Sequence, residues 1–123
     1  MNIQEYWYAV LRQDERTIKS FFCDDGYVNW HNTNEHFTVD EFIRANCEYP
    51  DLWDGSIERI EVIGNTVITV VAVFSQDKKL RFHVTSFIVL REDKIYSVDE
   101  YWGNDGEAPM WRQSLNLGSP IIK

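Results

Sequence analysis

The chain has 123 residues, of which 20 are acidic and 12 are basic, so its formal net charge is −8. This length predicts one domain, 1–123, and a hydrophobic share of 44% excludes a disordered or collagen-like chain. The negative charge, without a basic stripe, argues against nucleic acid as a partner. Five Trp, six Tyr and seven Phe leave two hypotheses, an aromatic-lined cavity or apolar interface on one side and a Trp-rich core on the other.

Helices are predicted at the N-terminus, where apolar residues recur at spacings of three and four over the first twenty residues. Asp14 is the expected N-cap of the second helix. A strand follows over 27–32, and its alternation places Trp30 and Asn32 on one face and His31 on the other.

A third helix is predicted from Thr38, because Glu41 stands three residues later in the pattern of a capping box. Asn46 lies on the apolar stripe of this helix, where a polar residue is either bonded to backbone or faces a cavity. The loop that follows carries Tyr49 and Trp53. These rings either close the mouth of a cavity or pack back onto the core.

The second half of the chain reads as an antiparallel meander, since turn residues recur about every ten positions. The expected strands are residues 57–63, 66–75, 80–90 and 95–102. Helices followed by a meander predict an α+β fold in which the helices pack on one face of a strongly curved antiparallel sheet. Trp111 and the final Ile pair suggest that parts of the tail, 103–123, dock. Whether Trp111 is a lid or a dimer contact stays open.

The last hairpin has a predictable register if its turn has two residues. His83 then opposes Trp102 and Thr85 opposes Glu100, with Phe87 on the same face. A carboxylate among aromatic rings has a raised pKa and suits general acid–base chemistry. The alternative is that His83 and Glu100 form a satisfied buried pair.

The opposite face of this hairpin is also apolar, and Val67, Thr69, Val71 and Val73 continue it on the preceding strand. An antiparallel sheet that is apolar on both faces is covered on both. We expect the helices to cover the face that holds Glu100, and loops or a second subunit to cover the other.

Other features of the sequence predict that the protein has no disulfide, no membrane segment, no metal and no cofactor. Cys23 and Cys47 are isolated, as expected of reduced, partly buried thiols. The N-terminus lacks the pattern of a signal peptide and the longest apolar stretch is too short to span a bilayer, which predicts a cytoplasmic protein without membrane contact. His31, Glu35 and His36 lie close in sequence without a regular ligand spacing, so we expect a polar surface loop, no metal and no cofactor.

Two motifs and the order of elements resemble the nuclear-transport-factor-2-like superfamily (cystatin-like fold), in its SnoaL-like branch. The motifs are the closing hairpin, 93–102, and the segment FCDDGYV, 22–28. The resemblance implies a cone with an apolar cavity and a homodimer formed through the outer face of the sheet. It places Glu100 where cyclase-like members have a cavity Asp, and Trp30 and Asn32 where epoxide hydrolases position water.

One departure limits what the resemblance implies, because 70–73 holds only Val and Ala where the epoxide hydrolases need Arg-x-Asp. Two functions remain. The first is a domain that binds a small apolar or cyclic molecule without settled catalysis. The second is an isomerase, cyclase or hydratase that uses Glu100 with His83. A structural dimerisation module is a third, weaker option. The expected ligand-binding residues are Trp30, Asn32, Asn46, Tyr49, Trp53, Thr85, Phe87 and Trp102.

Overall fold

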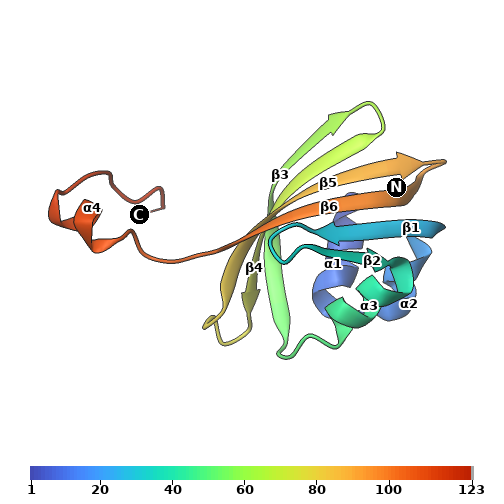
Figure 1. The fold of residues 1–123 in the computed structure, drawn as a ribbon, viewed down its shortest axis with the longest axis horizontal. Helices are drawn as coiled ribbons and strands as arrows, with labels where there is room; N and C mark the ends of the chain where they lie inside the picture. The colour runs from blue at the N-terminus through green and yellow to red at the C-terminus, as the bar shows by residue number, and fades with distance from the viewer. Residues whose placement is uncertain (123) are drawn as a thin grey trace.

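The computed structural model describes residues 1–122, which form four helices and six strands (Figure 1). In chain order the elements are α1 (Ile3–Arg12), α2 (Glu15–Ser20), β1 (Phe22–Trp30), β2 (Glu35–Thr38), α3 (Val39–Cys47), β3 (Trp53–Ile63), β4 (Thr66–Ser75), β5 (Arg81–Arg91), β6 (Lys94–Asn104) and α4 (Met110–Ser114). The α+β prediction is confirmed.

Side-chain caps begin the three N-terminal helices. The side chain of Asn2 accepts a hydrogen bond from the first turn of α1, and Asp14 does the same for α2. Thr38 Oγ1 accepts from the amide of Glu41 at 3.2 Å, while the Glu41 carboxylate accepts from the amide of Thr38 at 3.0 Å. Both the Asp14 cap and the capping box are therefore confirmed.

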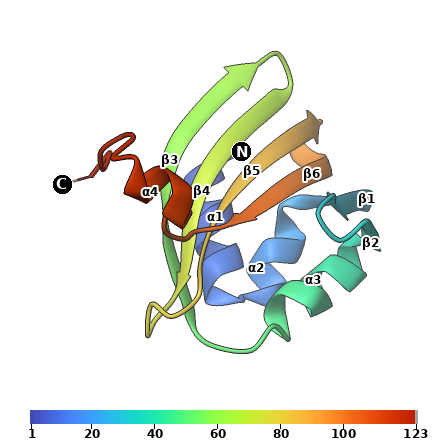
Figure 2. The ribbon, with the colours of Figure 1, turned by 60° about the vertical axis from the view of Figure 1, so that its left-hand side comes forward.

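The strands form one curved, open sheet in the order β2-β1-β6-β5-β4-β3. Helices α1, α2 and α3 lie together on one side of it (Figures 1 and 2). The prediction of an antiparallel sheet is wrong at one place, because β1 and β6 pair in parallel. These strands are about seventy positions apart in the chain, and the alternation within a strand carries no information on the direction of such a distant partner. β3 also begins at Trp53, four residues earlier than predicted.

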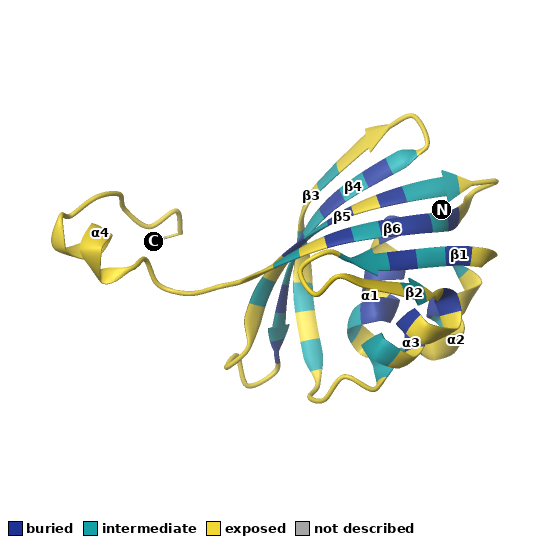
Figure 3. Ribbon diagram, in the orientation of Figure 1, coloured by how far each residue is buried: buried dark blue, intermediate teal, exposed yellow. Residues whose placement is uncertain are grey.

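The core lies between the helices and the inner face of the sheet. Tyr6 and Trp7 of α1 are buried there, and burial alternates strictly along β4 (Figure 3). The buried residues of β4 are Val67, Thr69, Val71, Val73 and Ser75. The four β4 residues that were expected on the outer face, 67, 69, 71 and 73, therefore face the core, and that prediction is wrong.

A β-bulge explains this reversal of faces. Arg91 opposes Lys94 as predicted, but Val89 opposes Ser97, so Tyr96 is an extra residue on β6. Because side chains alternate along a strand, one extra residue moves every later partner to the other face.

Beyond the bulge, Ser86 and not Thr85 opposes Glu100. Val84 and not His83 opposes Trp102. The even-numbered residues of β5 therefore share the inner face with Glu100 and Trp102.

The C-terminal tail extends away from the domain after β6 (Figure 1). Every described residue from 105 to 122 is exposed, and Trp111 has 60% of its surface accessible. The interpretation of Trp111 as a lid is therefore wrong, whereas the alternative, a dimer contact, stays a prediction. None of the helices in the described part of the chain is long and apolar enough to cross a membrane.

Candidate ligand-binding site

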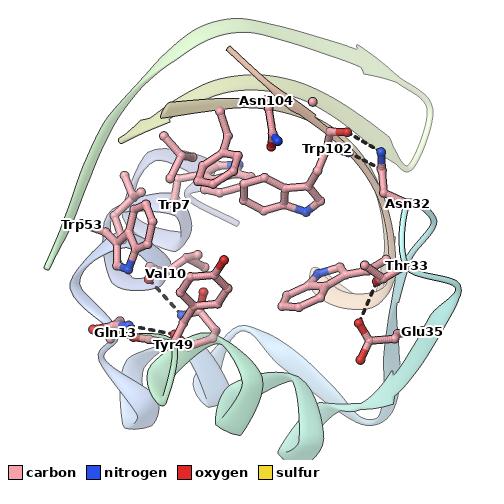
Figure 4. Close-up of a pocket in the computed structure, with 16 residues that line it drawn as sticks. Trp7, Val10, Gln13, Asn32, Thr33, Glu35, Tyr49, Trp53, Trp102 and Asn104 are labelled. Atoms are coloured by element: carbon pink, nitrogen blue, oxygen red, sulfur yellow. Dashed lines mark hydrogen bonds between the residues drawn. The ribbon is translucent and has the colours of Figure 1, made fainter. Parts of the chain in front are cut away.

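A cavity of about 620 Å³ opens between the inner face of the sheet and the C-terminal ends of α1 and α3 (Figure 4). Aromatic side chains form most of its wall. They are Trp7, Trp30, Tyr49, Trp53, Phe82 and Trp102. Four of the five Trp residues of the chain thus line one space.

Five of these rings follow one another around the wall as a connected series, which we call the aromatic arc. Neighbouring ring centroids are 5.4 Å apart for Tyr49 and Trp53, and 6.0 Å apart for Trp53 and Phe82. The series continues from Phe82 to Trp102 at 6.0 Å and from Trp102 to Trp30 at 6.5 Å. Most of these contacts are edge-to-face, the arrangement that ring quadrupoles favour.

Hydrogen bonds from indole N–H groups hold three of the Trp residues in place. Trp7 Nε1 donates to Thr69 Oγ1, Trp30 Nε1 to a Glu100 carboxylate oxygen and Trp53 Nε1 to the carbonyl of Pro50, each at 3.0 Å. These three rings are therefore each held in one orientation.

Asn32 fixes the position of Trp102 from just beyond the end of β1. Its Nδ2 donates to the carbonyl of Trp102 at 2.5 Å, and its Oδ1 accepts from the amide of Trp102 at 2.6 Å. The side-chain amide of Asn32 thereby continues the β1–β6 pairing by one step, because it offers the same donor and acceptor as a peptide group.

Gln13 and Asn46 join the helices to the loop that carries Tyr49. Gln13 ends α1 in the left-handed conformation, and its Nε2 donates to the carbonyls of Asn46 and Tyr49, both at 2.9 Å. Asn46 Nδ2 donates to the carbonyl of Val10 at 3.0 Å. These bonds tie α1 to α3 and hold the Tyr49 ring at the cavity.

Glu100 lies beside the cavity and does not line it. Its surface is 3% exposed, and its oxygens accept hydrogen bonds from Ser86 Oγ at 2.6 Å and from Trp30 Nε1. Burial raises the pKa of Glu100, while the hydrogen bonds from Ser86 and Trp30 and the nearby N–H of Trp102 partly oppose that rise. The charge of Glu100 also adds to the effect of burial in raising the pKa of Tyr6.

Trp102 Nε1 faces the same carboxylate without an ordinary hydrogen bond to it. The N–H is buried and has no acceptor among the described residues. Two indoles and a hydroxyl thus converge on one carboxylate, and its two oxygens already serve Trp30 and Ser86.

The structure separates the predicted site residues into three groups. Those that line the cavity are Trp30, Asn32, Asn46, Tyr49, Trp53 and Trp102. Glu100 is buried behind Trp30. His83, Thr85 and Phe87 lie on the outer face of β5, because the bulge reverses the predicted register. The expected grouping of His83 and Thr85 with Glu100 is therefore wrong.

His83 has other partners on the outer face. Its Nδ1 is 2.6 Å from an Asp105 carboxylate oxygen and its Nε2 is 3.2 Å from one of Glu58. The hydrogen bonds that the ring makes to the carboxylates of Asp105 and, second, of Glu58 raise the pKa of His83. This imidazole is paired at the surface and contributes nothing to the cavity.

Four residues at or beside the cavity were not predicted from the sequence as site residues, namely Ser86, Trp7, Phe82 and Gln13. Trp7 carried a signal, since it stands three residues before Val10 on the apolar stripe of α1. No sequence signal pointed to Ser86 or Phe82, because the bulge decides which face of β5 is the inner one.

The loop after β1 shows no metal site. His31 Nε2 lies 2.7 Å from Asp99 Oδ1, and its ring stacks on Tyr101 with centroids 4.4 Å apart. His36 Nδ1 lies 2.7 Å from Asn29 Oδ1. Within residues 1–122 no group of three His, Cys, Asp or Glu side chains has the arrangement of a metal site.

Solved structures match the chain over nearly its whole length. A ketosteroid isomerase candidate from Kribbella flavida has a TM-score of 0.81 at 18% identity, over 98% of this chain and 88% of that one. An NTF-2-like protein of unknown function from Burkholderia xenovorans has a TM-score of 0.78 at 19% identity, over 97% and 91%. The chain has the nuclear-transport-factor-2-like fold. The predicted fold is thereby confirmed.

A third match with this fold is an LEH-like epoxide hydrolase from M. tuberculosis, with a TM-score of 0.67 at 15% identity, over 82% of this chain and 79% of that one. At such identities the likeness concerns the fold alone. No family model matches the chain, and no curated protein matches it. In this chain the inner face of β4 contributes Val73 to the cavity wall, and Val71, two residues earlier, is buried in the core.

Proposed function

We propose that this domain binds a small apolar or cyclic molecule in the cavity, as a member of the SnoaL-like branch. The observation that carries the proposal is the aromatic arc around a cavity of about 620 Å³. Small-molecule sites commonly have this volume and a mostly apolar wall with a few placed polar groups. A Trp-rich core would instead have filled this space with its own rings.

Indole N–H resonances test the proposal, because four of the five Trp residues lie in the cavity wall. N-phenyl-1-naphthylamine, a neutral fluorescent probe, is titrated while ¹H–¹⁵N spectra are recorded. We expect saturable shifts for Trp7, Trp30, Trp53 and Trp102, together with a rise in probe fluorescence. Trp111, 60% exposed in the tail, serves as the internal control and should not shift.

Paired variants strengthen the assignment. Trp53→Leu removes a ring of the arc and should weaken probe binding, whereas Trp111→Leu should leave it unchanged. A probe that shifts Trp111 as much as the wall residues, or that shifts no indole, would contradict binding in the cavity.

General acid–base catalysis at Glu100 is the second candidate. The burial-raised pKa of Glu100 supports it, because a carboxyl group with a raised pKa is a better general acid than an ordinary one. Both oxygens of Glu100 are engaged and the group does not line the cavity, and His83 lies on the other face. Binding therefore ranks first. Glu100→Gln separates the two, since an acid–base enzyme loses turnover with any substrate while keeping its affinity.

A further inference from the structure

Most hydrogen-bond donors in the cavity wall already donate to acceptors within the protein. The N–H groups of Trp7, Trp30 and Trp53 point to acceptors in the protein. The side-chain N–H groups of Gln13 and Asn46 donate to backbone carbonyls. The Tyr49 hydroxyl and the Asn104 side-chain amide also line the cavity, and they are donors that bond to no other described residue.

Acceptors, in contrast, remain free. Gln13 Oε1 and Asn46 Oδ1 accept no hydrogen bond from any described residue, while the amide nitrogens of the same side chains are both occupied. Trp102 Nε1, the one indole N–H of the wall without an acceptor among residues 1–122, is buried and has no exposed surface to offer a ligand. The wall thus combines π faces with a few side-chain amides and one hydroxyl, and each of these polar groups has an oxygen that can accept a hydrogen bond.

The formal charge of the side chains around the cavity is negative. None of the described residues that line it is Lys or Arg, and Glu35 stands among them. Glu35 accepts a hydrogen bond from Thr33 at 2.7 Å, which holds its carboxylate in place. The whole chain carries a formal charge of −8, so the surrounding field also favours cations.

We propose that the ligand of this cavity is an organic cation, an alkylammonium group with apolar substituents. A cation within about 6 Å of an aromatic ring centroid is attracted by the ring quadrupole, most strongly by Trp. The arc offers three Trp rings, one Tyr and one Phe in succession, and the free oxygens of Gln13 and Asn46 can accept from an ammonium N–H. This inference rests on the proposed function and narrows it to one ligand class.

An isosteric pair of probes tests the charge alone. Benzyltrimethylammonium and neopentylbenzene have the same shape, and they differ in a quaternary nitrogen against a quaternary carbon. A plain apolar cavity binds the neutral compound more tightly, because the cation must leave water. We expect the reverse here, with the cation bound at least about tenfold more tightly in titrations followed by indole N–H shifts.

Three variants make the test specific. Trp53→Leu should weaken the cation more than the neutral isostere, because the lost quadrupole acts only on charge. Tyr49→Leu should do the same, and Tyr49 is 45% exposed on a loop, so this change does not put folding at risk. Trp111→Leu is the matched control in the tail and should change neither affinity.

The outcomes separate this inference from the proposed function. Equal or tighter binding of neopentylbenzene overturns the cation proposal and leaves an apolar binding site standing. The same holds if N-phenyl-1-naphthylamine binds and benzyltrimethylammonium does not. If no probe shifts the wall indoles, both proposals fail.

Discussion

Replacing Glu100 by Gln probes the buried carboxylate with little change in shape. The Gln Oε1 can keep the acceptor role toward Trp30 Nε1, and the Ser86 hydroxyl can rotate to accept from the new N–H. The variant thus retains the hydrogen bonds and removes only the ability to carry charge. Its stability relative to the wild type reports the cost of burying that charge.

The sign of the pH dependence follows from the raised pKa of Glu100. Below the unfolded value, near 4.5, the carboxyl group is neutral in both states and burial of charge costs nothing. As the pH rises from there through the folded pKa, the wild type loses stability, because the unfolded chain releases the proton more readily. Each unit of separation between the two values amounts to about 1.4 kcal/mol. Gln is neutral throughout, so its advantage grows over this window and then stays constant.

Urea unfolding followed by Trp fluorescence measures the difference at intervals from about pH 5 to about pH 9. Glu107→Gln, in the exposed tail, is the control for removing one acidic residue and should show no such growth. A difference between Glu100→Gln and wild type that does not change with pH would refute the reasoning. So would a difference that moves against Gln as the pH rises.

Three further predictions follow from the packing. Ser86→Ala removes a hydrogen bond to Glu100 and should cost about 1.5–3 kcal/mol in urea unfolding when that group is charged, and less when it is neutral. Gly55→Ala would place a Cβ 2.4 Å from the carbonyl of Ala72, so β3 must shift, at a cost of about 1–3 kcal/mol in thermal unfolding. Phe87→Lys, on the outer face at 39% exposure, should lower the mass measured by light scattering if the proposed homodimer forms there.

Each of these has a contrary result. A loss in Ser86→Ala that does not depend on pH would separate the hydroxyl from the charge of Glu100. Unchanged stability in Gly55→Ala would show that the β3–β4 pairing adjusts freely at this point. A wild-type mass of one chain, or an unchanged dimer in Phe87→Lys, would remove the outer face as the interface.

The sequence by itself determined the local structure and the fold class. The caps at Asp14 and Thr38 depend on residues within one turn, and the strands of the meander depend on alternation and turns between neighbours in the chain. The alternation in β1 also placed Trp30 correctly on the face opposite to His31, and the family resemblance indicated that this face is the inner one. These features are local, so their signals stand in the sequence.

The tertiary structure decided the composition of the site. One extra residue at Tyr96 exchanged the faces of β5, which moved His83 to the surface and brought Ser86 to Glu100. The parallel pairing of β1 with β6 then placed Trp30 beside the same carboxylate. Register and strand direction arise from contacts between distant segments, and a bulge leaves no mark in the alternation on either side of it, so only the folded chain could show which side chains share the cavity.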